Sequence, residues 1–191
     1  MNTNSKNEID RKNLDLSQSI DDLITIDISG RGFVKKAYKM ARKHSETPLI
    51  YKAANDLRKV VGSKKCVPIV IATGATCIRP GLPCGIGEMD GPPGAIALAR
   101  FLGRAFSCIP ILVTDEGQGK MLEKVAYSAG LHPLEFKQIL YQANNAKYVS
   151  SVKIIEVSSD EKKAQEQSKW IFDNYKPGAL IAIEKGGKNN K

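Results

Sequence analysis

The feature that most constrains the fold is an alternation of short apolar runs and longer helical stretches, which begins near residue 66. The apolar runs are rich in β-branched residues, have the length of buried strands, and are separated by helical periodicity. Strands that alternate with helices predict βαβ units, and therefore a parallel sheet with helices on its faces. We predict an α/β fold, a Rossmann-like three-layer parallel sheet of about four strands. The predicted strands are 67–73, 109–114, 153–157 and 179–183, and the predicted helices are 92–105, 117–130, 133–143 and one that starts with a capping box at 158–161 and ends near 174.

Residues 1–65 lack this alternation and have a mostly helical pattern. The chain opens with a polar stretch, and we predict that residues 1–15 are a flexible N-terminus. Residues 16–191 are long enough for one domain with a sizeable core, so we predict a single α/β domain there. In this division, residues 16–65 are a helical preface and residues 66–191 contain the sheet.

The net charge of +9 is concentrated in one basic segment, residues 31–65, which holds eleven basic and two acidic residues. A helix within it has an apolar face of Phe33, Val34, Ala37, Tyr38, Met40 and Ala41 and a basic face of Lys35, Lys36, Lys39, Arg42 and Lys43. Such a helix could face nucleic acid, an anionic membrane or an acidic substrate. Since no nucleic-acid-binding motif or aromatic interleaving accompanies it, we interpret it as a solvated surface helix packed on a core. We expect neither nucleic acid nor a membrane as partner.

The composition gives no sign of a secreted or membrane-embedded protein. The polar N-terminus has no apolar segment of the secretory type, and the longest apolar runs are far too short to cross a bilayer. The four cysteines are therefore expected to be reduced thiols. We predict a cytoplasmic location, or the mitochondrial matrix if the source is eukaryotic. Formation of a homo-oligomer stays open.

Carboxylates follow several predicted strands at the point where each strand ends. The first predicted strand runs into a glycine- and proline-rich loop that carries Glu88 and Asp90. The next strand along the chain is followed by Asp115, and the last strand is followed by Glu184. Ligands of open α/β sheets bind beyond the carboxyl ends of the strands, so these side chains should meet at one edge. We predict that a Glu184 carboxylate oxygen lies near Glu88 or Asp90, directly or through an ion or water.

Converging carboxylates need a cation, a basic partner or a shared proton. No histidine lies beside these acids and no cysteine pair has zinc spacing, so the oxygen ligands indicate a hard ion, Mg²⁺ or Mn²⁺. A structural alternative exists for two of them, because Asp90 and Asp115 could cap the helices that follow. Glu88 and Glu184 have no such explanation, and we therefore prefer a functional interpretation for the set.

Two glycine-rich segments match nucleotide-binding motifs only in part. Segment 85–90 opens like G-x-G-x-x-G, but Asp90 occupies the place of the third glycine, where a carboxylate would repel a pyrophosphate. Segment 117–120 lacks the spacing and the Ser or Thr of a P-loop. The sequence therefore argues against a dinucleotide or P-loop site.

Four segments, in this order, resemble the D-glutamate cyclase family. They are IATG at 71–74, GEMDGPPGA at 87–95 with the helix after it, LVTDE at 112–116 and AIEKGGK at 182–188. The resemblance implies a metal-associated α/β domain and a lyase of glutamate metabolism, which cyclises D-glutamate to 5-oxo-D-proline with loss of water. The family's domain continues beyond the last of these segments, so we expect this chain to be truncated at its C-terminus.

The chain departs from the family pattern at three positions. Met89 stands where the family has a threonine, which removes a hydroxyl near the acids. Lys185 and Lys188 stand where the family has arginines, so the charge is kept but the bidentate fork that suits a carboxylate is lost.

The implied cyclisation needs a deprotonated α-amine, an electrophilic γ-carboxylate and an oxygen that leaves as water. A divalent ion on Glu88 and Asp90 would polarise the carboxylate, and Glu184 or Asp115 would transfer the protons. Binding of the substrate, a small anion such as D-glutamate, is assigned to Thr73, Gly74, Gly91, Gly94 and Lys185. The same residue types would suit a phosphate ester, so a metal-dependent phosphohydrolase is an alternative. A non-catalytic anion-binding module is another.

Overall fold

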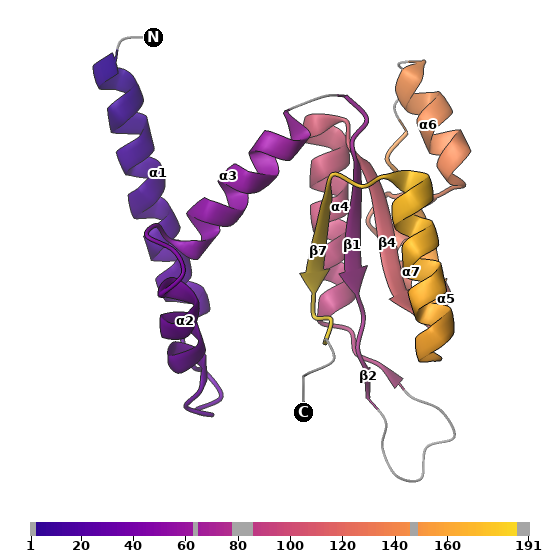
Figure 1. Cartoon of the computed structure of the whole chain (residues 1–191), viewed down its shortest axis with the longest axis horizontal. Coiled ribbons are helices and arrows are strands. Elements are labelled where there is room, and N and C mark those ends of the chain that lie inside the picture. The colour runs from indigo at the N-terminus through magenta and orange to yellow at the C-terminus, as the bar shows by residue number, and fades with distance from the viewer. Residues whose placement is uncertain (1–2, 63–64, 78–85, 146–148, 187–191) are drawn as a thin grey trace. The chain divides into compact units, whose positions relative to one another are not determined.

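The chain forms two compact units, Met1–Lys59 and Val60–Lys191. The first is helical and the second contains the sheet, as the sequence pattern predicted (Figure 1). The computed structural model describes residues 3–62, 65–77, 86–145 and 149–186. Gly85 and Lys188, which belong to motifs named above, lie outside the described residues.

The first unit is organised by a buried carboxylate, Asp21. It accepts hydrogen bonds from the backbone N–H of Leu49 (2.7 Å) and Ile50 (3.1 Å) and from the Tyr38 hydroxyl (3.0 Å). A carboxylate at a helix N-terminus satisfies amide donors that have no partner within the helix. Asp21 thereby connects three helices, which are α1 (Thr3–Ile24), α2 (Val34–Arg42) and the start of α3 (Leu49–Val61). Helix α1 begins inside the stretch 1–15, for which we predicted flexibility.

Helix α2 corresponds to the predicted basic helix and is more exposed than expected. It contains no buried residue, and its sheltered side consists of Val34, Tyr38 and Arg42, which are half-buried. Phe33 and Met40, which the pattern assigned to the packed face, are 54% and 56% exposed. Lys35, Lys36, Lys39 and Lys43 are exposed as predicted, but Arg42 of the predicted basic face is half-buried and donates to the Ser45 and Thr47 carbonyls. The packed face is also narrower than predicted, because only residues four apart face inward.

The second unit contains a five-stranded sheet in which all neighbouring strands are parallel. The strands are, in spatial order, β5 (His132–Pro133), β6 (Ser151–Val157), β4 (Ile109–Asp115), β1 (Pro68–Thr73) and β7 (Ala179–Ile183). Four of them are the predicted strands. The fifth, β5, is two residues long and includes a proline, so it carries no strand pattern, and we had placed Pro133 in a helix.

Helices cover both faces of this sheet, which makes three layers. Helix α4 (Gly91–Phe106) packs on β1 and β4, with α5 (Gly119–Ser128) beside it. On the other face, Ile171 of α7 (Glu161–Tyr175) and Phe136 of α6 (Phe136–Asn144) pack with Val70 and Ile111. Figure 1 shows α4 and α7 on opposite sides of β1 and β4. Central strands of a parallel sheet are buried on both faces, which explains the continuous apolar run from Ile69 to Ile71.

The starts of two helices test the predicted caps. Helix α4 begins at Gly91 and has prolines in its first turn, as predicted, where no amide donor is missed. The capping box predicted at Ser158 is wrong. Asp160 is the N-cap of α7, and its carboxylate accepts the Lys163 N–H at 2.9 Å, because Asp160 has the extended backbone that an N-cap needs.

A short antiparallel pair, β2 (Thr76–Cys77) with β3 (Ile86–Gly87), follows β1 and was not predicted. The backbone N–H of Glu88 donates to the Ala75 carbonyl at 2.8 Å and extends this pair by one more bond. Glu88 is the residue directly after β3, so the pair fixes the backbone that leads into it. Over the residues that the structure describes, no helix is both long and apolar enough to cross a membrane.

Candidate functional site

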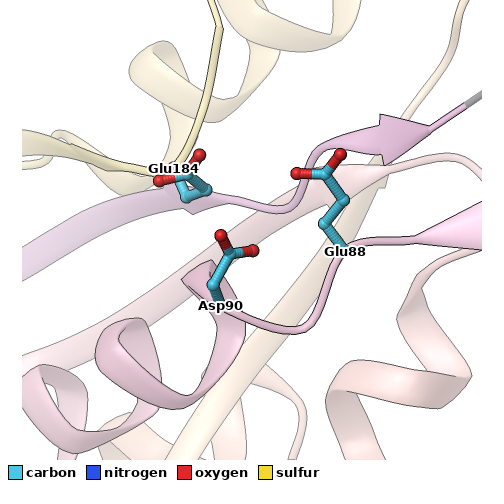
Figure 2. A group of neighbouring side chains, drawn as sticks. All are labelled: Glu88, Asp90 and Glu184. Carbon is cyan, nitrogen blue, oxygen red and sulfur yellow. The ribbon is translucent and has the colours of Figure 1, made fainter. Parts of the chain in front are cut away.

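Three carboxylates meet beyond the carboxyl ends of β1 and β7. Glu88 follows β3, Asp90 immediately precedes α4, and Glu184 immediately follows β7. One oxygen from each lies within 4.8 Å of the other two. Figure 2 shows the three side chains directed from separate segments toward a common space. The prediction that Glu184 lies near Glu88 or Asp90 is therefore confirmed.

All three carboxylates of this acidic triad are exposed, and they carry like charges at close range. None of them makes a hydrogen bond or an ion pair with a residue that the structure describes. Like charges in this arrangement repel each other unless a cation or a proton is shared between them. The triad therefore has the donor chemistry and the unbalanced charge of a cation site.

Asp90 is not a helix cap, although it occupies the N-cap position of α4. Its backbone is helical (φ −81°, ψ −36°), and its side chain makes no capping hydrogen bond. A capping residue normally has extended backbone and accepts an N–H of the first turn. The structural alternative fails for Asp90, and its carboxylate is directed to the triad instead.

Gly91 explains how Asp90 and Glu184 come together. A Cβ atom on Gly91 would lie 2.6 Å from Cβ of Glu184 and 3.2 Å from the Ile183 carbonyl oxygen. Only glycine allows the first turn of α4 to approach the end of β7 this closely. Gly94, by contrast, has ordinary space, since its Cβ would lie 3.7 Å from Cγ2 of Ile183.

Glu184 has an unusual backbone conformation. Its φ of +48° lies in the left-handed region, which non-glycine residues rarely adopt. Residues held in this region cluster at functional sites, where the surrounding structure maintains the strain. The conformation turns the chain out of β7 and presents the Glu184 side chain to the other two acids.

Asp115 and Lys185, which we assigned to proton transfer and substrate binding, contact each other. The Lys185 ammonium forms an ion pair with the Asp115 carboxylate and also donates to the Gly74 carbonyl at 3.3 Å. Asp115 is not a member of the triad, nor does it cap α5, whose first N–H is bound elsewhere. The predicted roles of Asp115 and Lys185 stay predictions.

Two buried hydroxyls lie at the carboxyl ends of the central strands. Thr73 is completely buried and Thr114 is nearly so, and neither hydroxyl oxygen has a hydrogen-bond partner among the described residues. The Thr73 hydroxyl oxygen would lie 2.9 Å from a Cβ atom placed on Gly91, so it is adjacent to the first residue of α4. The Thr114 oxygen is 2.7 Å from the Cβ position of Gly74, whose φ is +92°. Buried polar atoms without partners are rare and mark places where a water or a ligand atom is expected.

Gly91 and Gly94, to which substrate binding was assigned, lie at the start of α4, where few backbone N–H groups are open to an anion. Pro92 and Pro93 have no N–H, and the N–H of Gly94 occupies the first position that bonds to the N-cap carbonyl in a regular helix. Of the two glycines, Gly91 is therefore the one whose N–H is left for a ligand. Substrate binding by Gly91 and Gly94 stays a prediction.

Glu156 is a structural carboxylate that the sequence analysis missed. It lies in β6 and accepts the Gly119 N–H at 2.5 Å, at the start of α5. The sequence pattern could have indicated Glu156, because it is an acid near the carboxyl end of a predicted strand, like the other acids of this sheet edge. Glu116, a second acid near this edge, accepts hydrogen bonds from the Ser158 hydroxyl (3.3 Å) and Ser159 N–H (3.4 Å).

Together, the parallel sheet and the acids beyond its carboxyl ends define an α/β domain with a candidate metal site. The family model described as D-glutamate cyclase-like, C-terminal, matches residues 20–191. The chain belongs to this family, which confirms the resemblance. No curated protein and no solved structure matched the chain.

Proposed function

We propose that the chain cyclises D-glutamate to 5-oxo-D-proline with loss of water, and that Glu88, Asp90 and Glu184 hold a divalent ion, Mn²⁺ or Mg²⁺, for this reaction. The observation that carries the proposal is the acidic triad, together with membership of the D-glutamate cyclase-like family. The completely buried Thr73 hydroxyl has no hydrogen-bond partner among the described residues, and its position beside Gly91 supports a ligand site there.

The residues fit such an ion. Oxygens are the ligands that Mg²⁺ and Mn²⁺ prefer, and two oxygens bound to one Mg²⁺ at about 2.0–2.1 Å are at most about 4.2 Å apart. The triad oxygens all lie within 4.8 Å of one another, so a small movement of these exposed side chains would bring all three to one ion. A bound divalent ion would act as a Lewis acid on the γ-carboxylate of the substrate.

The net reaction moves two protons from the substrate ammonium to the oxygen that leaves as water, while the nitrogen bonds to the carbon of the γ-carboxylate. The protein must therefore supply a group that exchanges protons beside the substrate. A carboxylate has two oxygens, so Glu184 can face the ion with one and exchange a proton through the other. Asp115 is the second candidate, although in this structure it is bound to Lys185.

The reaction is tested by incubating the purified chain with D-glutamate, L-glutamate or a chromogenic phosphate ester, each with and without Mn²⁺. We expect Mn²⁺-dependent formation of 5-oxo-D-proline, measured by chiral chromatography with mass detection, and its loss in Glu88→Gln. Hydrolysis of the phosphate ester alone would support the alternative phosphohydrolase. Ligand binding without any product would support the anion-binding module. The cytoplasmic location and the oligomeric state stay predictions from the sequence.

A further inference from the structure

We propose that Lys185 is a positioning residue for Glu184. By binding Asp115 and the Gly74 carbonyl, Lys185 holds the chain in the conformation that brings the Glu184 carboxylate to Glu88 and Asp90. This inference rests on the proposed metal site, because it assigns the affinity of that site in part to a residue that does not touch the ion.

The direction of the Glu184 side chain is not fixed by bonds of its own. Its carboxylate has no hydrogen-bond or ion-pair partner among the described residues. Strand pairing ends at the preceding residue, Ile183, which pairs with Thr73. Among the described strands, β7 is an edge strand that pairs only with β1. The backbone of Glu184 must therefore orient its side chain, and that backbone is in the strained left-handed region.

Lys185 is the adjacent residue that can maintain this conformation. Its ammonium contacts Asp115, the last residue of β4, and the carbonyl of Gly74, which follows β1. Lys185 thereby connects the chain after β7 to the carboxyl ends of β4 and β1. The Lys185 side chain is 26% exposed, whereas that of Lys169 in the surface pair Lys169–Asp173 is 78% exposed. Partly sheltered ion pairs are screened less by salt and solvent than fully exposed ones.

Gly91 also limits the position of Glu184. Cβ of Glu184 lies only 2.6 Å from where a Cβ atom of residue 91 would be, so Glu184 packs directly against the first residue of α4. Glu184 is thus held by the first residue of α4 and by the contacts of Lys185. Helix α4 sets how close Glu184 can come to Asp90, and Lys185 sets the turn that directs its carboxylate.

Two other roles for Lys185 make different predictions. If Lys185 served as a counter-charge to the triad, its removal would tighten the binding of a cation, because one positive charge near the site is lost. If Lys185 bound the substrate carboxylate, as the sequence analysis suggested, its removal would raise KM and leave metal affinity unchanged. A positioning role predicts weaker metal binding.

The experiment is a Mn²⁺ titration, by calorimetry, of the wild-type chain and of Lys185→Met, Asp115→Asn and the double variant. We expect the Kd for Mn²⁺ to rise about 10- to 100-fold in Lys185→Met, the usual effect of removing a residue that orients a metal ligand. The double variant removes one positive and one negative charge, so its net charge is unchanged. It should bind no more weakly than the single variants, because all three lose the same contact.

Two further variants control for fold and charge. Lys185→Arg keeps the ion pair and should restore most of the affinity. Lys153→Met removes another half-buried ion pair, with Glu135 at 2.8 Å, in the amino half of β6, and should leave the Kd for Mn²⁺ unchanged. Circular dichroism reports whether each variant is folded, and if Lys185→Met is not, the near-isosteric Asp115→Asn carries the same expectation.

Unchanged or tighter Mn²⁺ binding in folded Lys185→Met and Asp115→Asn overturns the positioning role while the metal site stands. No Mn²⁺ binding by the wild-type chain overturns the proposed metal site, and the positioning role with it. The two failures are therefore distinguishable in one titration series.

Discussion

Gly91 and Glu184 are in such close contact that a single methyl group at Gly91 would lie 2.6 Å from Cβ of Glu184. Through this contact, the first glycine of the Gly-Pro-Pro-Gly segment limits how close Glu184, an acid far away in the chain, comes to α4. We expect Gly91→Ala to push the start of α4 away from β7, which costs about 1–3 kcal/mol of the free energy of unfolding, as overpacking does. The same change should weaken Mn²⁺ binding, because Asp90 moves with Gly91.

Gly94 supplies the matched control. Its Cβ position has an ordinary 3.7 Å contact, and Gly94→Ala should stabilise the chain by about 0.5–1 kcal/mol, because alanine favours the helix. Urea denaturation measures the unfolding free energy of both variants, and calorimetry measures their Mn²⁺ affinity. Equal effects of the two substitutions would show that the Gly91–Glu184 contact does not matter.

The second prediction concerns the ion itself. Mn²⁺ that binds only the folded chain should raise its melting temperature by mass action, with a stabilisation of about 2.7 kcal/mol at 100 times the Kd. Glu88→Gln and Asp90→Asn should abolish this rise and leave the ion-free melting temperature almost unchanged, because neither side chain bonds to a described residue. Variants that respond to Mn²⁺ like the wild type would rule out the metal site, and variants that simply unfold would show a structural role.

The strands and the acidic site could be predicted from different signals. Short, continuous apolar runs rich in β-branched residues predicted four of the five strands, because strands buried on both faces of a parallel sheet have such runs. The topology rule for α/β sheets then placed Glu184 near Glu88 and Asp90, and the triad agrees with it.

The parts that could not be predicted depend on tertiary contacts. The strands β2, β3 and β5 are two residues long, too short for any periodicity. The ion pair of Lys185 with Asp115 joins residues 70 positions apart and left no pattern in the sequence. Ser158 was predicted as a cap because its spacing to Glu161 fits a capping box, but the backbone favoured Asp160.

The third prediction concerns thiol reactivity. Burial, with a smaller contribution from neighbouring Cys66, raises the pKa of the Cys108 thiol from 9.0 to about 11. Only about one in a thousand Cys108 thiols is then ionised at pH 8, and the thiolate is the form that reacts. We expect iodoacetamide to modify the half-buried Cys66 before Cys108, as followed by peptide mass spectrometry. Between pH 8 and pH 10 the rate at Cys108 should rise about a hundredfold, in proportion to its thiolate. Equal rates for the two thiols at pH 8, in a chain shown by circular dichroism to be folded, would contradict this prediction.

The last prediction concerns Glu184, whose carboxylate has no hydrogen-bond or ion-pair partner among the described residues. Glu184→Gln is nearly isosteric and removes no hydrogen bond to a described residue, so the melting temperature without Mn²⁺ should change little. If Glu184 transfers a proton, D-glutamate turnover should fall by about 10²–10⁴-fold. If it also ligates the ion, the Kd for Mn²⁺ should rise in the same variant, and saturating Mn²⁺ should not restore turnover. The matched control is Glu156→Gln, which removes the acid that binds the start of α5 and should lower stability rather than metal affinity. Turnover and Mn²⁺ binding that both survive Glu184→Gln would remove Glu184 from the site and leave its left-handed backbone unexplained.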